Sequence, residues 1–521
     1  MHFYAILPFA LLLWWPAQRP FPALLLFEGP FATLAVVVGQ ILLLVAVALV
    51  LGHRLVARVD RDPAHMVRAQ ATYHAGTLVL RIFVLLTLAV DLFCTQWPEW
   101  IRSAAILDNS WAIDELIILS PFFVSMILGW AALYRTDARL RDLAGRQDGL
   151  QEPNGPESPH WTLTQYLVFN LRHQLLIVAM PMMLLMLVFD RTRDSATWIS
   201  VSAISATAGS VFLLAPLLLR YVWSTERLPD GPLRTRLEKL SAGINLGFRD
   251  ILVWRSGGMV VNAAVMGLVA PLRYVLLSDA MLTSMTEDQI SAVFGHEAGH
   301  VKHRHIQFFV LFGILGTLIV SGIMELALRW GDRASGPAAL NLDEVSLIGF
   351  AGTVLVWGVG FGWISRRFER QADLFGARCA TPPHEGCLQP CSVHDPGHAP
   401  PGDSYRVCAT GAQMFVSALD RVAVLNGIPK KERSWRHSSI ASRIELLGRL
   451  AGDPAGARRF QRRIVAIKWT MAIGCVVGLL IAGVYVYRSP VYRKPLKDNL
   501  PFLFSGDSQL PWSSLGLISD G

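Results

Sequence analysis

Long apolar stretches separated by short polar segments dominate the chain and predict membrane-spanning helices. Each stretch is long enough to cross a hydrocarbon core of about 30 Å as a helix. The eight clearest are Phe31–His53, Ala75–Trp97, Ile113–Tyr134, Tyr166–Phe189, Trp198–Val222, Gln307–Leu328, Val345–Ser365 and Ile464–Tyr487. A further apolar stretch at the start contains several prolines, which favour a broken or re-entrant helix, and it lacks the basic segment of a cleaved signal peptide. We therefore expect a mainly α-helical polytopic membrane protein with about eight or nine transmembrane helices.

The composition agrees with this interpretation. Hydrophobic residues make up 53% of the chain and charged residues 17%, whereas soluble domains carry about 25% charged residues. The formal net charge of +8 is typical of arginine-rich loops at a membrane surface. We therefore expect a lipid bilayer as a partner and no nucleic acid.

The arginines also predict the orientation of the helices. They cluster after Phe31–His53, after Ile113–Tyr134 and after Trp198–Val222, while the loops between these clusters are short and mixed or acidic. The positive-inside rule places the arginine-rich loops in the cytoplasm. Segments 224–306 and 366–463 would then lie inside, and the tail after the last apolar stretch would lie outside.

One cytoplasmic segment, "MTEDQISAVFGHEAGH", has the pattern of a metal-binding helix. Thr286 and Gln289 form a capping-box pattern at its start. His296 and His300 are four residues apart, so their imidazoles project from one face and can share a metal ion. Glu297, beside the first histidine, can take a proton from a water at that metal. This is the H-E-x-x-H pattern of zinc hydrolases.

A polar collar at the membrane surface is the alternative explanation of so many polar residues before an apolar stretch. Such a collar would favour Lys and Arg, which extend their charged ends to the membrane surface. Lys302, His303, Arg304 and His305 fit that role, and we assign them no catalytic part.

A catalytic zinc needs a third protein ligand, and the segment "SRRFERQADLFGARCA" supplies a candidate. Glu369 and Asp373 are four residues apart on a predicted helix. Glu369 can complete a His–His–Glu ligand set, and Asp373 can accept the N–H of a ligand histidine. The alternative is that both carboxylates only pair with nearby arginines.

These segments together resemble the membrane zinc metallopeptidases of the HtpX type and the related CAAX prenyl endopeptidases, over roughly residues 224–450. The matching stretches are "VVNAAVMG", "RYVLLSDAMLTSMTEDQISAVFGHEAGHVKHRH", "FERQAD" and "RHSSIASRIELLGRL". The resemblance implies a zincin-like endopeptidase domain with one zinc ion per chain. It implies His296, His300 and Glu369 as ligands and Glu297 as general base and acid.

The resemblance also implies roles around the substrate. His437 and Arg443 would act near the scissile peptide, where a cationic or hydrogen-bonding group can stabilise the oxyanion. An edge strand at Val260–Gly267 would receive an extended substrate at Asn262 and Ala263. Alternatively, His437 is a surface residue, Arg443 pairs with a nearby glutamate, and the strand is an ordinary buried one. Ser438 stands where the family often has proline, and residues 1–220 show no convincing match.

Four cysteines cluster after the second ligand segment: Cys379, Cys387, Cys391 and Cys408. Their surroundings are rich in Pro and Gly and predict an irregular insert at residues 380–408. A second, structural zinc is one hypothesis, although the spacing lacks paired C-x-x-C knuckles. We favour a flap over the active site with incidental thiols; on the opposite membrane side two disulfides would be expected.

These inferences divide the chain into three parts. Residues 1–222 form an N-terminal transmembrane bundle. Residues 223–463 form the metallopeptidase domain, including a membrane hairpin at 307–328 and 345–365. Residues 464–521 form a last transmembrane helix and a short tail.

The function expected is a multi-pass zinc metalloendopeptidase of a bacterial inner membrane, with its active site facing the cytoplasm. It would cleave membrane-associated or unfolded polypeptides. CAAX prenyl-protein processing and a signalling sensor-protease are the alternatives, and a transporter with an inactive zinc site is disfavoured because every catalytic letter is present. The oligomeric state cannot be read from the sequence.

Overall fold

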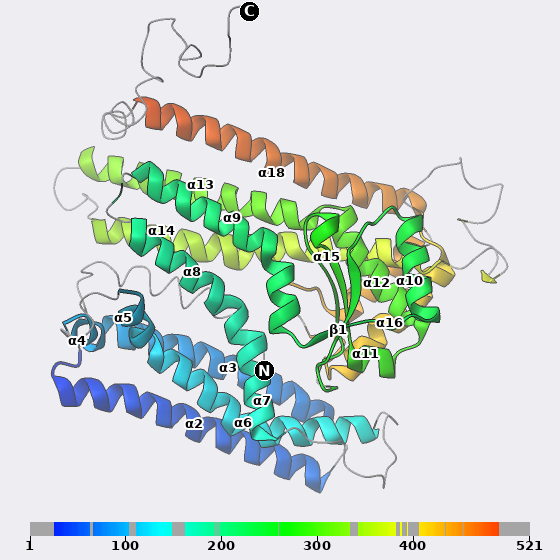
Figure 1. Cartoon of the computed structure of the whole chain (residues 1–521), viewed down its shortest axis with the longest axis horizontal. Coiled ribbons are helices and arrows are strands. Elements are labelled where there is room, and N and C mark those ends of the chain that lie inside the picture. The colour runs from blue at the N-terminus through cyan, green and yellow to red at the C-terminus, as the bar shows by residue number, and fades with distance from the viewer. Residues whose placement is uncertain are drawn as a thin grey trace, which may run out of the picture. The chain divides into compact units, whose positions relative to one another are not determined.

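The computed structural model is mainly helical with one small sheet (Figure 1). It describes residues 26–62, 66–103, 111–147, 162–192, 195, 197–258, 260–333, 342–381, 386–387, 393, 406–432, 434–451 and 453–488. The chain divides into two compact units. One comprises Met1–Ile306 with Gly362–Arg462, and the other comprises Gln307–Phe361 with Arg463–Gly521.

Three long helices begin the first unit: α2 (Pro30–Arg61), α3 (Met66–Phe93) and α6 (Ser120–Gln147). Their shared core includes Leu44, Leu88 and Trp130, all of which are buried. The short helices α4 (Trp97–Ser103) and α5 (Trp111–Ile118) connect α3 to α6. The next helices are α7 (Leu163–Asn170), a π-helical turn η4 (Leu171–Leu176), α8 (Ile177–Thr192) and α9 (Thr197–Val222).

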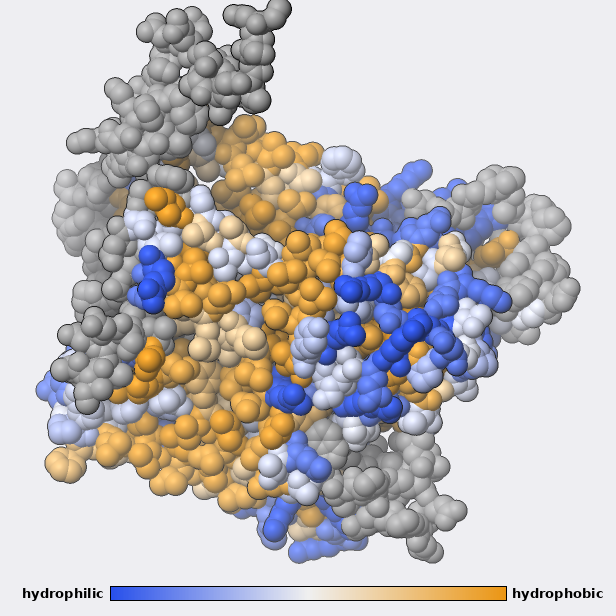
Figure 2. All heavy atoms as spheres, in the orientation of Figure 1, coloured by the Kyte–Doolittle hydropathy of each residue, from blue (hydrophilic) through white to orange (hydrophobic). Residues whose placement is uncertain are grey.

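Six helices in the described part of the chain are long and apolar enough to cross a membrane. They are Pro30–Arg61, Arg68–Phe93, Ile199–Val222, His305–Trp330, Leu347–Cys379 and Pro454–Arg488. On the face shown in Figure 2, hydrophobic residues gather over α2, α8 and α9, and hydrophilic residues gather around α10 and α12. This arrangement confirms an integral membrane protein, although not the expected number of eight or nine spans.

A four-stranded sheet follows the last of the N-terminal helices. Its strands are β1 (Thr225–Arg227), β2 (Asp250–Trp254), β3 (Ala263–Met266) and β4 (Tyr274–Ser278), and their order is β1-β2-β4-β3. The strands β2 and β4 are parallel, and the other two pairs are antiparallel. β3 therefore lies at the edge of the sheet, within the segment where an edge strand was expected.

The helices around the sheet share one hydrophobic core, which includes Leu237, Leu277, Phe294 and Phe415. These helices are α10 (Pro232–Gly243), α11 (Asp279–Ser284), α12 (Glu287–Lys302), α15 (Gly362–Cys379), α16 (Ala409–Leu425) and α17 (Ile440–Ala451), and a 3₁₀ turn η5 (Ala270–Leu272) precedes β4.

Close contact between α12 and α15 positions the candidate site. A Cβ atom added to Gly299 would lie 3.0 Å from Cβ of Phe375 and 3.1 Å from Cα of Ala372. One added to Gly295 would lie 2.6 Å from Cβ of Cys379. Two glycines one helical turn apart therefore let the two backbones approach closely.

The second unit contains most of α13 (His305–Arg333), α14 (Leu342–Leu355), the π-helical turn η6 (Val356–Phe361) and the apolar part of α18 (Pro454–Arg488). Gly474 and Gly478 of α18 face Leu315 and Leu318 of α13. The hydroxyl of Tyr485 donates a hydrogen bond to Glu325 at 2.6 Å. This unit therefore has its own helix–helix packing.

Candidate active site

The start of α12 is fixed by the capping box that its sequence predicts. The hydroxyl of Thr286 accepts from the backbone N–H of Gln289, and the Gln289 side chain accepts from the backbone N–H of Thr286. His296 and His300 follow on one face of this helix, one turn apart. Their Nε2 atoms lie 3.3 Å from each other.

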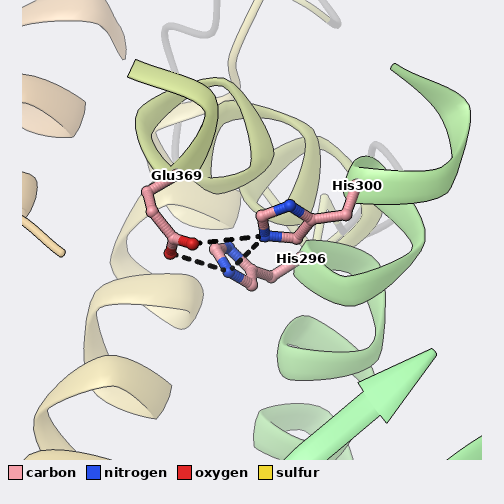
Figure 3. A group of neighbouring side chains, drawn as sticks. All are labelled: His296, His300 and Glu369. Atoms are coloured by element: carbon pink, nitrogen blue, oxygen red, sulfur yellow. Dashed lines mark hydrogen bonds and ion pairs between the residues drawn. The ribbon is translucent and has the colours of Figure 1, made fainter. Parts of the chain in front are cut away.

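Glu369 of α15 completes the cluster (Figure 3). Its carboxylate oxygens lie 3.6 Å from Nε2 of His296 and 3.7 Å from Nε2 of His300. Two nitrogens and an oxygen at about 2.0–2.1 Å from a tetrahedral zinc are separated by about 3.4 Å. The three observed separations, 3.3, 3.6 and 3.7 Å, therefore fit a zinc ion. Among the residues described, this trio is the group of metal-binding side chains whose ligand atoms all lie within 4.8 Å of one another.

Asp373 lies behind His296. Its Oδ1 is 3.0 Å from Nδ1 of His296, and its two oxygens accept from the guanidinium of Arg443, with 2.8 Å between Nε and Oδ2. Asp373 is 1% exposed and Arg443 is 7% exposed. Arg443 thus pairs with Asp373 and not with a neighbouring glutamate, and together the two residues orient the first imidazole.

His305 lies behind His300, and this contact corrects our assignment of His305 to a polar collar. The residue is fully buried, and its Nδ1 lies 2.9 Å from Nδ1 of His300. The chain turns between α12 and α13 at Arg304, whose φ of 56° is in the left-handed region. A contact five residues away across such a turn has no helical spacing, so the sequence pattern could not reveal it.

Glu297 faces the sheet. Burial raises the pKa of its carboxyl to about 7, against the opposing effects of the charge on His296 and, to a smaller extent, of a hydrogen bond from the backbone N–H of Val265. A carboxylate with a pKa near neutral pH is suited to accept and return a proton. The site therefore combines a candidate ligand set with an adjacent carboxyl group suited to proton transfer.

The charges in the cluster favour a bound cation. Burial disfavours a charged imidazole, but the carboxylates of Asp373 and Glu369 outweigh it and raise the pKa of His296 to about 10. Burial lowers the pKa of His300 to about 4, so this imidazole is neutral at neutral pH. A bound divalent metal ion would supply a positive charge that the carboxylates of Asp373 and Glu369 stabilise.

His437 reaches the same cluster from the loop before α17. Its Nδ1 lies 3.0 Å from Oε2 of Glu369, and its side chain is 48% exposed. It is the most exposed of the side chains described around the ligands, since those of His296, His300 and Asp373 are 10%, 19% and 1% exposed. His437 therefore lies at the solvent-exposed side of the cluster.

The edge strand β3 directs backbone groups toward this site. Ser278 of β4 donates to the carbonyl of Asn262, so the antiparallel pairing directs the N–H and C=O groups of Ala263 and Val265 away from β4. The N–H of Ala263 is bonded to the side chain of Asn262 at 3.0 Å, and that of Val265 reaches Glu297. Asn262 is exposed, whereas Ala263 is buried.

The cysteines of the insert lie near the other end of α15. Sγ of Cys387 is 3.2 Å from Sγ of Cys408, and Cys379 contacts the position of Gly295. Cys391 lies outside the described residues. The second zinc therefore remains a prediction.

The segment that contains most of this site is similar to known peptidases. Residues 227–427 match the model of Peptidase family M48. The chain is 26% identical over 171 residues to a protease HtpX homolog of Archaeoglobus fulgidus, covering 32% of this chain and 48% of that protein. It is 30% identical over 173 residues to a CAAX prenyl protease 1 homolog of Arabidopsis thaliana, covering 32% and 40%.

The crystal structure of S. mikatae Ste24p is also similar, with a TM-score of 0.48 and 15% identity over 81% of this chain and 99% of that one. The chain spans about half the length of the curated relatives that it matches, or less. The family match and the two relatives confirm the expected resemblance to HtpX-type and CAAX prenyl endopeptidase-type membrane metallopeptidases.

Proposed function

Taking the match of residues 227–427 to Peptidase family M48 as the premise, we propose that this chain is an integral-membrane zinc-dependent metalloendopeptidase. The observation that carries the proposal is the convergence of His296, His300 and Glu369 from two helices within 4.8 Å. We expect one zinc ion per chain at these three residues. When bound there, zinc would polarise the scissile carbonyl and acidify the attacking water.

Glu297 is the proposed general base and acid. It takes a proton from the attacking water and returns it to the leaving amine. Its pKa of about 7 allows both steps near neutral pH, and the N–H of Val265 holds its carboxylate in place.

His437 and Arg443 have different proposed roles. His437 is partly exposed beside Glu369, so it can donate a hydrogen bond to the oxyanion of the tetrahedral intermediate. Nε and one terminal nitrogen of Arg443 both donate to Asp373. This pairing supports a positioning role for Arg443, in which it fixes the carboxylate that orients His296.

The substrate is proposed to bind as an added strand. The outward carbonyl groups of β3 would accept hydrogen bonds from an extended peptide beside Glu297, near Asn262 and Ala263. Backbone pairing is largely indifferent to side chains, which suits membrane-associated or unfolded polypeptides. The similarity to a CAAX prenyl protease 1 homolog favours prenyl-protein processing as the second candidate.

The finer membrane assignment is also a proposal. We expect eight or nine spans in a bacterial inner membrane, with the arginine-rich loops and the active site on the cytoplasmic side. The six candidate helices and the hydrophobic surface over α2, α8 and α9 support a multi-pass protein.

The test is zinc content and casein cleavage by the purified protein in detergent. We expect one zinc per chain in the wild type and in Glu297→Gln, with cleavage lost in the variant by about 10²–10⁴-fold. Equal cleavage by both proteins would remove Glu297 from the mechanism. A wild type without zinc would refute the metallopeptidase assignment.

A further inference from the structure

A buried chain of side chains extends from His300 away from the other ligands. Nδ1 of His300 is 2.9 Å from Nδ1 of His305, and Nε2 of His305 is 2.9 Å from Oε1 of Gln371. The amide nitrogen of Gln371 donates to Oε1 of Gln461 at 2.5 Å. His305, Gln371 and Gln461 are 0%, 1% and 7% exposed.

The direction of these hydrogen bonds decides whether His300 can bind a metal. Because Gln371 donates to Gln461, its Oε1 faces His305 and accepts the proton on Nε2 of that ring. Nδ1 of His305 then carries no proton and accepts from Nδ1–H of His300. Nε2 of His300 is left with a free electron pair toward His296 and Glu369. If every bond were reversed, the proton would lie on Nε2 of His300 and block binding.

The rings are also held in this arrangement by packing. The His305 ring stacks on Phe368, with 4.4 Å between ring centroids and 7° between the planes. Phe368 and Gln371 both belong to α15, the helix that supplies Glu369. One helix therefore provides a ligand, a platform for His305 and the amide that accepts from His305.

We propose that Gln371 is a positioning residue that sets the direction of this chain through His305 and keeps His300 in its metal-binding tautomer. The inference rests on the proposed zinc site. It means that the two ligand histidines are oriented by different groups: His296 by a carboxylate paired with arginine, and His300 by a neutral relay.

Two variants of Gln371 separate this role from simple packing. Gln371→Glu keeps an acceptor for His305, whereas Gln371→Met keeps the volume and removes the acceptor. If Gln371 sets the tautomer, Gln371→Glu holds zinc within about threefold of wild type, and Gln371→Met loses about 10–100-fold in zinc affinity. If Gln371 only fills space, the order reverses, because methionine fits an apolar site and a buried carboxylate destabilises it.

The measurement is the zinc dissociation constant of the full chain in detergent, by competition with a chromophoric chelator, together with the melting temperature. Lys302→Gln, at an exposed position on α12, is the control. Should a Gln371 variant fail to fold, His305→Gln, which retains a donor and an acceptor, is compared with His305→Leu, and only the second is expected to lose zinc. Wild-type affinity in Gln371→Met, or in His305→Leu, would overturn the inference while leaving the zinc site intact. A wild type that binds no zinc would instead refute the proposed function.

Discussion

Arg443 donates two hydrogen bonds to Asp373, and both residues are almost completely buried beside His296. Removing one partner of a buried ion pair leaves an uncompensated charge, which costs about 3–5 kcal/mol. We therefore expect Arg443→Gln to lower the free energy of unfolding by about that amount and to weaken zinc binding about 10–100-fold. Denaturant unfolding and chelator competition in detergent measure the two effects.

Arg449→Gln is the matched control for this prediction. Arg449 lies on the same helix, α17. Its exposed side chain forms a long ion pair with Glu445, with 3.9 Å between Nε and Oε1. Its removal should change stability by less than about 1 kcal/mol. Adding Asp373→Asn to Arg443→Gln should recover part of the lost stability, because neither of the two positions then carries an unpaired buried charge. Additive losses in the double variant would show that the two residues do not act as a pair.

Replacement of His437 should separate catalysis from metal binding. The residue lies 3.0 Å from Glu369 but is half-exposed, and it is not one of the three proposed ligands. His437→Phe is expected to retain one zinc per chain and to lower kcat about 10²–10³-fold, as loss of an oxyanion donor does. Metal analysis and steady-state kinetics on a fluorogenic peptide measure these quantities. Loss of zinc with kcat unchanged per bound zinc would make His437 a ligand and not a catalytic residue.

At position 265 of the edge strand, the backbone N–H should contribute more to catalytic activity than the side chain does. Val265→Pro removes the N–H that reaches Glu297, at a position whose N–H does not bond to β4. A hydrogen bond to a charged group contributes about 1.5–3 kcal/mol, so kcat/KM should fall by about one to two orders of magnitude. Val265→Ala keeps the N–H and should remain within about threefold of wild type. Equal activity of the proline and alanine variants would exclude a role for this hydrogen bond.

We expect zinc binding to require the close approach of α12 and α15. A Cβ at Gly299 would lie 3.0 Å from Cβ of Phe375 and 3.1 Å from Cα of Ala372, neither of which is the end of a flexible side chain. Gly299→Ala should therefore separate the helices, destabilise the protein by about 1–3 kcal/mol and weaken zinc binding. Gly448→Ala is the control, because nothing lies within 4 Å of the added atom. At this helical position it should stabilise slightly. Thermal unfolding and zinc titration of both variants test this prediction. Unchanged zinc affinity in Gly299→Ala would contradict it.

The core of the site could be predicted because its spacing is local. Four-residue intervals and a capping box place His296, Glu297 and His300 on one helix. The same interval links Glu369 to Asp373, and all of these residues take the predicted positions. Their catalytic roles remain predictions.

The remaining contacts depend on how distant segments meet. His305 contacts His300 across the turn at Arg304, and Gln371 contacts Gln461, which lies 90 positions away in the sequence. The sequence also did not determine the ion-pair partner of Arg443, because nearby glutamates were alternative partners to Asp373. No periodicity encodes such contacts, which arise from tertiary packing.

A single structural element controls both histidine ligands. Glu369, Gln371 and Asp373 all project from α15 and reach the metal trio, the relay behind His300 and the ring of His296. A small rotation or translation of α15 would break the contacts of all three residues at once, while the H-E-x-x-H segment on α12 stayed in place. An inactive state of the proposed peptidase would then need no inhibitor, only a shift of this one helix.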